Sequence, residues 1–317
     1  MSAGHRAQHR PTLGIALILL MAVCFASMDS LIRYLGLLLP VWLILWARYS
    51  FQAIAMTLWL TIRALRGGPG FRVAHPKFQF VRGLLLLVTS AMSFYGVQYM
   101  PVAEFTAINM LTPVVVTLLA AMLLHEHVTP LRWALVVGGF AGALIVIRPG
   151  SGLFGWAVLF PLTGALSYAS FQVLTSKLAS LEDPFTTHFY TGLTGAVLLS
   201  LLLWFGPFDL QAALHGATPD QLALLCVIGG LGTLGHLLLI LALGLASTGT
   251  LMPFIYVQIA AAAAIGWLAF DHLPDAAAWL GMAVISASGA AAVWLNVHEA
   301  QARRQADSAV LQDTIAD

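Results

Sequence analysis

The sequence predicts an all-α integral membrane protein with ten transmembrane helices, arranged as two inverted five-helix repeats. Hydrophobic residues make up 60% of the 317 residues and charged residues only 9%, and the mean hydropathy is +0.90. Soluble domains carry about 25% charged residues, whereas an apolar run of about 20 residues spans the hydrocarbon core as a helix. Such runs fill the chain at residues 12–32, 40–62, 78–98, 102–124, 131–148, 154–178, 185–205, 221–243, 250–270 and 277–296.

The distribution of Lys and Arg predicts that both termini are cytoplasmic. With the N-terminus inside, only Arg33 and Arg148 of the 14 basic residues fall on the outer side, and Arg48 lies within a span. This asymmetry follows the positive-inside rule and indicates a multi-pass protein of a bacterial inner (plasma) membrane. The residues predicted on the inner side are Arg6, Arg10, Arg63, Arg66, Arg72, Lys77, Arg82, Arg132, Lys177, Arg303 and Arg304.

The two halves of the chain resemble each other. At an offset of 144 residues Arg33 aligns with Lys177, and at an offset of 145 Glu126 aligns with Asp271. Because each half contains an odd number of spans, the second copy must enter the membrane from the opposite side, as in many secondary transporters. We therefore expect a cytoplasmic N-terminal segment (1–11), a first repeat (12–148), a linker (149–153), a second repeat (154–296) and a cytoplasmic polar tail (297–317) with a disordered end.

The fourth span carries a family resemblance. The segment from Tyr99-Met100-Pro101-Val102-Ala103-Glu104 through Pro113 to Glu126 resembles the drug/metabolite transporter superfamily, with one EamA domain in each repeat. The chain departs from the family pattern at His125, where a glycine is typical. Phe25 to Asp29, Arg33, Arg48 and Arg82-Gly83 are similar to a subgroup of S-adenosylmethionine uptake carriers. The resemblance implies secondary active transport of a small organic metabolite.

Arg48 and Asp29 are the most unusual residues of the spans, because a charge within the membrane is costly and marks function by default. Arg48 lies near the midplane, about 12 Å past Pro40 at a rise of 1.5 Å per residue. It either binds a substrate carboxylate or phosphate through its forked donors or pairs structurally with carbonyls or with Asp29. Asp29 either forms an ion pair with Arg33 one turn away or binds protons or a cationic substrate.

The fourth span contains further candidates. Glu104 lies in the first helical turn, where the helix dipole favours an anion, so it either caps the helix or takes part in gating. Pro113 prevents the usual hydrogen bond to the carbonyl of Asn109. That carbonyl either binds a polar solute or is satisfied by neighbouring helices.

We expect the substrate cavity between the two halves, near the midplane. Its lining is predicted from the few polar and aromatic residues of the spans. Among them, His236 is alternatively a hydrogen-bonded packing residue. Predicted substrate-binding residues are Asp29, Arg48, Tyr95, Asn109, Tyr168, Gln172, His236, Tyr256 and Gln258, and predicted coupling or gating residues are Asp29, Arg33, Glu104 and Pro113.

The motifs favour a secondary transporter over other membrane proteins. No P-loop motif occurs, so coupling to protons or to a counter-substrate is expected rather than ATP hydrolysis. His125-Glu126-His127 lacks metal-binding spacing, and we predict neither a metal nor a cofactor. A membrane-embedded enzyme and a channel are the alternatives, although no catalytic motif is present. The expected partners are a small-molecule substrate and the lipid bilayer, with no nucleic acid, and Gly138-x-x-x-Gly142 permits helix packing within the protomer or in a homodimer.

Overall fold

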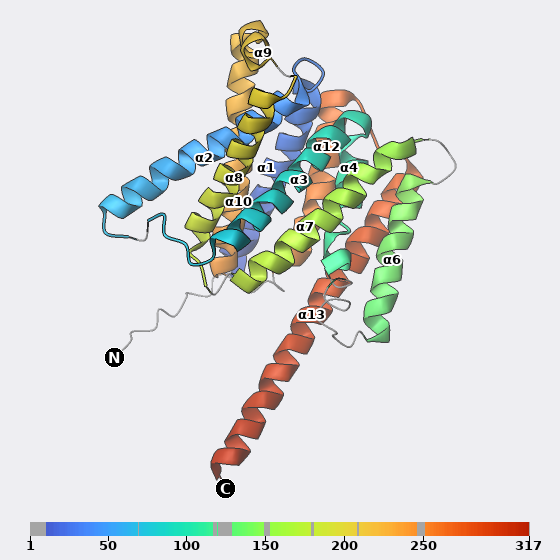
Figure 1. The fold of residues 1–317 in the computed structure, drawn as a ribbon. Coiled ribbons are helices and arrows are strands. Elements are labelled where there is room, and N and C mark those ends of the chain that lie inside the picture. Colours follow the sequence, from blue (N-terminus) through green and yellow to red (C-terminus); the bar gives the residue numbers. More distant parts are fainter. Residues whose placement is uncertain are drawn as a thin grey trace.

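The structure, a computed structural model, describes residues 11–68, 70–116, 119, 129–148, 153–178, 181–207, 209–245 and 251–316. Within these ranges the chain is helical and contains no strand (Figure 1). The helices are α1 (Pro11–Leu35), α2 (Val41–Leu65), α3 (Pro76–Tyr99), α4 (Val102–Asn109), α6 (Pro130–Ile147), η1 (Gly155–Val158), α7 (Leu159–Leu178), α8 (Pro184–Phe205), α9 (Leu210–Gly216), α10 (Pro219–Leu245), η2 (Met252–Tyr256), α12 (Val257–Phe270) and α13 (Ala276–Ala316).

Each predicted span contains helix in the described part of the chain, and three of these helices are short. Seven helices of the described part are long and apolar enough to cross a bilayer, and three more are apolar but shorter: Val102–Val116, Trp133–Ile147 and Phe254–Phe270. Helices without a polar face are stable only when lipid or protein covers them on all sides. The fold is therefore that of a multi-pass membrane protein.

The structure corrects the fourth span, which was predicted as one helix over 102–124. α4 ends at Asn109, a turn occupies Met110 and Leu111, and helical backbone resumes at Thr112. The break lies one turn before Pro113, whose missing N–H cannot bond to the Asn109 carbonyl. Residues 117, 118 and 120–128, which include His125-Glu126-His127, lie outside the described residues.

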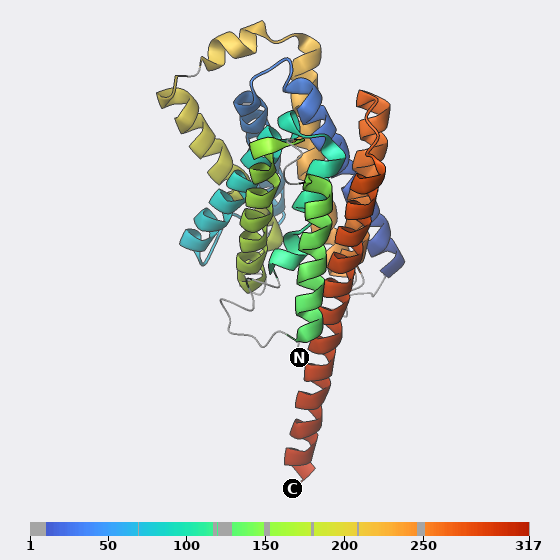
Figure 2. The ribbon, with the colours of Figure 1, turned by 90° about the vertical axis from the view of Figure 1, so that its right-hand side faces the viewer.

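The polar tail also differs from expectation. α13 continues as one helix from Ala276 to Ala316, and its C-terminal part projects beyond the other helices (Figures 1 and 2). The segment 300–316 contains Ala, Gln, Arg and Leu but neither Gly nor Pro, and these residues favour helix strongly. The expected disordered end was therefore wrong.

The helices of the two halves pack in matching pairs. By their order in each half, α1 corresponds to α7, α3 to α10 and α4 to α12. α1 contacts α10 and α12, and in the same way α7 contacts α3 and α4. α2 packs against α8, and α6 packs against α13 along the edge seen in Figure 2. α4 contacts α12. The interior of the protein is thus formed where helices from both halves meet.

Candidate functional site

Six polar residues meet in the interior, on five helices from both halves. We call them the central polar cluster: Asp29 on α1, Arg48 and Gln52 on α2, Ser90 on α3, His188 on α8 and His236 on α10. Arg48 is 2% exposed, Gln52 1% and His188 4%. Buried polar groups are costly unless they are hydrogen-bonded, so the partners of each atom show what the cluster can still bind.

Arg48 contacts a hydroxyl group and an aromatic ring, and it has a buried donor without a partner among the described residues. Its Nη1 donates to Ser90 Oγ at 3.3 Å, and its guanidinium carbon lies 4.7 Å from the centre of the Tyr49 ring. Its Nε is buried and has no hydrogen-bond partner in the described part of the chain. That atom faces α10, because a Cβ placed on Gly232 would lie 3.0 Å from it. A glycine at this position allows the guanidinium to approach the helix closely.

Gln52 fixes the protonation pattern of His188. Gln52 Nε2 donates to the His188 carbonyl oxygen at 3.0 Å, and it lies 3.2 Å from His188 Nδ1. A carbonyl only accepts, so the amide orientation is set, and Nδ1 accepts the second amide proton. Neutral His188 therefore carries its proton on Nε2. Gln52 Oε1 and His188 Nε2 are both buried without a partner among the described residues.

His236 lies beside these residues and presents the opposite pattern. Its Nδ1 lies 2.8 Å from the Gly232 carbonyl oxygen, so Nδ1 is the donor and the neutral ring keeps a lone pair on Nε2. The ring stacks on His188 with centroids 5.5 Å apart and meets the Phe25 ring edge-on at 5.0 Å. The predicted site residue His236 is thus joined by a second histidine.

Asp29 belongs to the central polar cluster and not to an ion pair with Arg33. Its carboxyl group is hydrogen-bonded by Ser93 and lies within the electrostatic influence of Arg48. Arg33 instead donates to the carbonyl oxygens of Val97 and Met100. The ion pair between Asp29 and Arg33, which the i, i+4 spacing indicated, is absent from the described structure.

Arg33 and Glu104 lie near the predicted outer end of the bundle. The Arg33 guanidinium is 5.3 Å from the centre of the Phe270 ring. Glu104 is in the first turn of α4, as predicted, and it is 4% exposed. Its Oε1 lies 3.0 Å from His272 Nε2, which follows α12. Glu104 therefore links the two halves in addition to any dipole effect.

Tyr168 and Gln172 lie near Arg82, which is closer to the predicted cytoplasmic end. They hydrogen-bond each other on α7. Arg82 donates to Thr175 Oγ1 and Thr191 Oγ1, both at 2.7 Å, and to the Thr187 carbonyl oxygen at 3.2 Å. Its guanidinium carbon also lies 4.5 Å from the centre of the Phe171 ring. The hydrogen-bond partners of Arg82 among the described residues are therefore all neutral.

The other predicted lining residues are distributed around the bundle. Tyr95 stacks on Phe160 at 6.5 Å between α3 and α7. The Asn109 carbonyl accepts from Thr112 Oγ1 at 2.8 Å, so it is satisfied locally, whereas Asn109 Oδ1 is buried without a partner among the described residues.

A Cβ on Gly289 of α13 would overlap the Tyr256 hydroxyl. Tyr256 therefore points toward α13. Gln258 is buried on α12.

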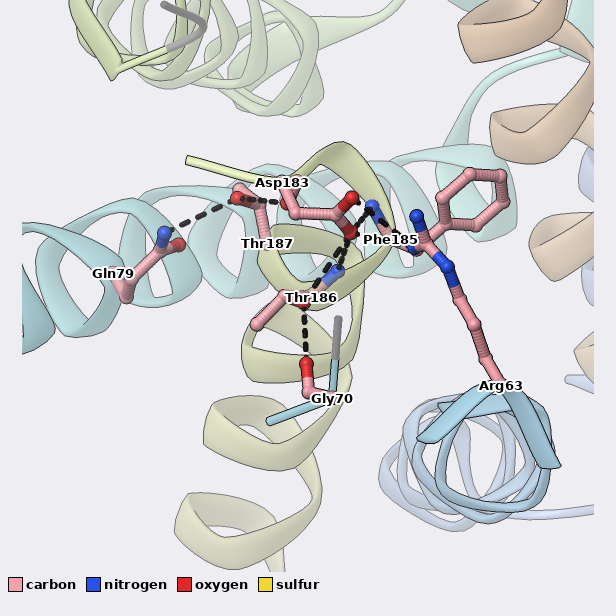
Figure 3. A network of polar contacts seen from close by, with 7 residues as sticks. All are labelled: Arg63, Gly70, Gln79, Asp183, Phe185, Thr186 and Thr187. Carbon is pink, nitrogen blue, oxygen red and sulfur yellow. Dashed lines mark hydrogen bonds and ion pairs between the residues drawn. The ribbon is translucent and has the colours of Figure 1, made fainter. Parts of the chain in front are cut away.

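A second polar network ties the loops at the predicted cytoplasmic end. Asp183 caps α8 by accepting from the amides of Phe185 and Thr186, both at 3.0 Å, and Arg63 Nη1 donates to both of its oxygens at 3.0 and 3.1 Å (Figure 3). Partial burial acts to raise the pKa of Asp183, but the Thr186 amide and the Arg63 guanidinium outweigh it and hold this pKa below its ordinary value.

The same network joins the two halves of the chain. Thr186 Oγ1 donates to the Gly70 carbonyl oxygen at 2.9 Å, and Gln79 Nε2 donates to Thr187 Oγ1 at 3.2 Å (Figure 3). Glu182 Oε1 accepts from the amides of Ala74 and His75 at 3.0 and 2.8 Å. The α2–α3 connection is thus attached to the start of α8.

A salt bridge lies at the opposite, predicted outer end. Arg148 Nη2 donates to Asp275 Oδ1 at 2.6 Å. The Ala278 amide, and then the Arg148 guanidinium, lower the pKa of the Asp275 carboxyl group below its ordinary value.

Sequence reasoning missed Gln52, Ser90 and His188. Gln52 follows Arg48 by four residues, which places both on one helix face, and His188 is an ionisable residue inside a predicted span. Both signals were present in the sequence. No group of three or more His, Cys, Asp or Glu residues in the described ranges has the geometry to hold a metal ion.

Comparison with known proteins gives consistent results. The family model described as "EamA-like transporter family" matches residues 12–148 and 155–294. The chain is 26% identical over 276 residues to an S-adenosylmethionine uptake transporter of Rickettsia bellii, which covers 86% of this chain and 91% of that protein. It is 30% identical over 219 residues to a riboflavin transporter of Rhizobium johnstonii, covering 69% of this chain and 70% of that protein. A solved structure titled only "Crystal structure of protein" shares the fold, with a TM-score of 0.58 at 19% identity over 91% of this chain and 97% of that one.

Proposed function

We propose that this chain, which belongs to the EamA-like transporter family, is a secondary active transporter that moves a small polar organic metabolite across the bacterial inner membrane by alternating access. The family and the relatives identify a transporter of small metabolites and not an enzyme. Energy coupling, the access mechanism, the orientation and the substrate are the parts that we propose.

The helix pairing supports an inverted repeat. When the helices of the first half are exchanged with those of the second, the contact between α1 and α10 becomes that between α7 and α3. The contacts of α2 with α8 and of α6 with α13 map onto themselves. Such a pattern is expected when two similar halves are related by a two-fold axis in the membrane plane.

The single observation that carries the proposal is the central polar cluster. Arg48 and Asp29 come from the first half and His188 and His236 from the second, and all are surrounded by apolar helices. Substrate sites of inverted-repeat transporters lie between the repeats near the midplane. A buried cluster with partnerless donors and acceptors at that position is suited to bind a polar solute.

Contacts between the two halves at both ends of the bundle support the proposed alternating access. Glu104 and His272 join α4 to the end of α12 at the predicted outer end, while Arg63, Asp183 and Glu182 join the halves at the predicted inner end. If the repeats exchange conformations, the contacts at one end break while the contacts at the other end remain formed. Asp29 is the proposed proton-binding residue in a proton-coupled cycle, and exchange against a counter-substrate is the other proposed mode.

Purified full-length protein tests the proposal in two steps. A thermal-shift screen against a metabolite library, with S-adenosylmethionine and riboflavin included because relatives are named for them, identifies ligands that stabilise the native state. Counterflow into proteoliposomes preloaded with each hit then measures exchange, with protein-free liposomes as the control. Saturable counterflow without ATP is the expected result. Flux that does not saturate would indicate a channel, and no exchange of any hit would contradict transport.

A further inference from the structure

Three buried polar atoms of the central polar cluster have no partner in the described structure: Arg48 Nε, Gln52 Oε1 and His188 Nε2. The first and third carry protons, because an arginine Nε is always a donor and His188 Nδ1 already accepts from Gln52. Gln52 Oε1 is an acceptor, because its amide orientation is fixed by the His188 carbonyl. These three atoms thus offer two donors and one acceptor.

Gln52, which carries the acceptor, is a neighbour of both residues that carry the donors. Gln52 is one helical turn from Arg48 on α2 and is hydrogen-bonded to His188. Residues four apart are neighbours on a helix face. A solute that satisfies all three atoms must therefore present two acceptors and one donor. Leaving any of these buried atoms unpaired costs free energy. The site therefore favours a solute that pairs with all three atoms over one that leaves any of them unpaired.

The charge of the surroundings adds a second condition. Arg48 and Arg82 bring two guanidinium groups into the buried interior, and Asp29 is the one carboxylate of the cluster. The partners of Arg82 among the described residues are all neutral. Like charges in a low-dielectric interior repel strongly, so the site disfavours a solute with a fixed positive charge.

We propose that the central polar cluster binds a neutral, planar solute through an acceptor–donor–acceptor edge, the pattern of a cyclic imide, and discriminates against a sulfonium cation. The proposal rests on the proposed function and names the substrate class of the same site. Of the two compounds for which the compared relatives are named, riboflavin contains a cyclic imide in its ring system, whereas S-adenosylmethionine carries a sulfonium.

Two matched ligand pairs test the proposal with wild-type protein. Riboflavin and its N3-methyl derivative differ at the imide N–H, and S-adenosylmethionine and S-adenosylhomocysteine differ by the methyl group that creates the sulfonium charge. Titration of the purified protein should show riboflavin binding at least about tenfold more tightly than the N3-methyl derivative, as expected for one buried acceptor left unpaired. S-adenosylmethionine should bind no more tightly than S-adenosylhomocysteine.

The Gln52→Leu variant distinguishes hydrogen bonding from the bulk of the added methyl group. Without Oε1 the preference for riboflavin over its N3-methyl derivative should fall to near unity, whereas the matched variant Gln211→Leu on exposed α9 should keep the wild-type preference. A preference unchanged in Gln52→Leu would overturn the proposal. Should that variant not fold, the wild-type pairs decide it.

The outcomes for the inference and for transport are distinguishable. Failure of riboflavin to bind, equal binding of the N3-methyl derivative, or tighter binding of S-adenosylmethionine than of S-adenosylhomocysteine would each overturn the imide proposal. If the protein then exchanges a library metabolite that lacks an imide, transport stands and only the substrate class is wrong. If it exchanges none, the proposed function fails as well.

Discussion

Three arginines show, at the scale of single residues, how this protein keeps charge inside a membrane. Arg33 donates to two backbone carbonyls near the predicted outer end, and Arg82 donates to two hydroxyls and a carbonyl near the predicted inner end. Arg48, between them, is the one of the three that retains a buried N–H without a partner in the described residues. The cost of burying that donor is tolerable if a solute pairs with it during transport.

Asp29→Asn tests the proposed coupling role. The substitution removes the charge and nearly preserves the shape, and the amide can still hydrogen-bond to Ser93. If Asp29 binds the proton that drives uptake, the variant should exchange substrate across the membrane at close to the wild-type rate but should not accumulate it in response to a pH gradient. Proteoliposome assays in both modes make the comparison. Wild-type accumulation driven by a pH gradient in Asp29→Asn would rule out the coupling role.

Asp183 provides a pH-dependent prediction for stability. Because its pKa is lowered in the folded state, its ionised form stabilises the protein above the unfolded-state pKa of about 3.9, and this contribution is lost as the pH falls through the lower folded-state pKa. Asp183→Asn keeps a capping side chain but removes the charge that Arg63 binds. The variant should therefore melt below wild type at neutral pH, and the difference should shrink below about pH 4.

Thermal unfolding in detergent from about pH 7 to pH 3 measures this difference. Asp209→Asn is the matched control, because Asp209 caps short helix α9 and forms no ion pair among the described residues. A gap between wild type and Asp183→Asn that widens in acid would contradict the prediction. Asp183→Ala, which also removes the cap, should cost about 1 kcal/mol.

Sequence reasoning identified three residues of the central polar cluster for a clear physical reason. Arg48, Asp29 and His236 were identified because ionisable groups are rare and costly in membrane spans. The partners of these residues depend on helix rotation and on which helices meet, and neither follows from spacing within one helix. For this reason the contact of Tyr256 with α13 and the hydrogen bonds of Arg33 to the Val97 and Met100 carbonyls were not predicted.

At the scale of elements, the positions of the helices were predictable because a bilayer requires long apolar runs. Pro113 indicated a break in the fourth span. The position of the break, at Met110 and Leu111, depends on where the chain becomes helical again after the lost hydrogen bond. The polar tail was misjudged because its charge was weighed above its helix propensity.

The seam between α6 and α13 depends on two glycines. A Cβ on Gly142 would lie 2.9 Å from the Gly281 carbonyl oxygen, and a Cβ on Gly281 would lie 2.7 Å from the Gly142 carbonyl oxygen. Both are closer than real contacts allow, so Gly142→Leu must separate the helices and should destabilise the protein by about 1–3 kcal/mol. Gly138-x-x-x-Gly142 thus provides close packing within the protomer, as such motifs do in membranes.

Thermal melting of purified Gly142→Leu, compared with wild type, tests the seam. Gly216→Leu at the end of exposed α9 is the control, because a Cβ there meets nothing within 4 Å. The control should melt like wild type. Equal melting temperatures for Gly142→Leu and wild type would mean that α6 and α13 do not pack as described.

At the scale of the whole molecule, the proposal depends on two halves of opposite orientation that share one interior site. The ten predicted spans put both termini on the same side, and the Lys and Arg distribution predicts that this side is the cytoplasm. A protease site appended to the C-terminus should be cleaved in spheroplasts only after permeabilisation. Cleavage of intact spheroplasts would contradict the predicted orientation.

The central claim is that substrate passes through the central polar cluster, and counterflow with one conservative variant tests it most directly. Arg48→Lys keeps the positive charge but loses the planar fork and the Nε donor, whereas Arg66→Lys makes the same change at an exposed position after α2. With the metabolite found by screening, Arg66→Lys should exchange at the wild-type rate, and Arg48→Lys, although folded by thermal melting, should lose at least about tenfold. Exchange at the wild-type rate by Arg48→Lys would contradict the claim.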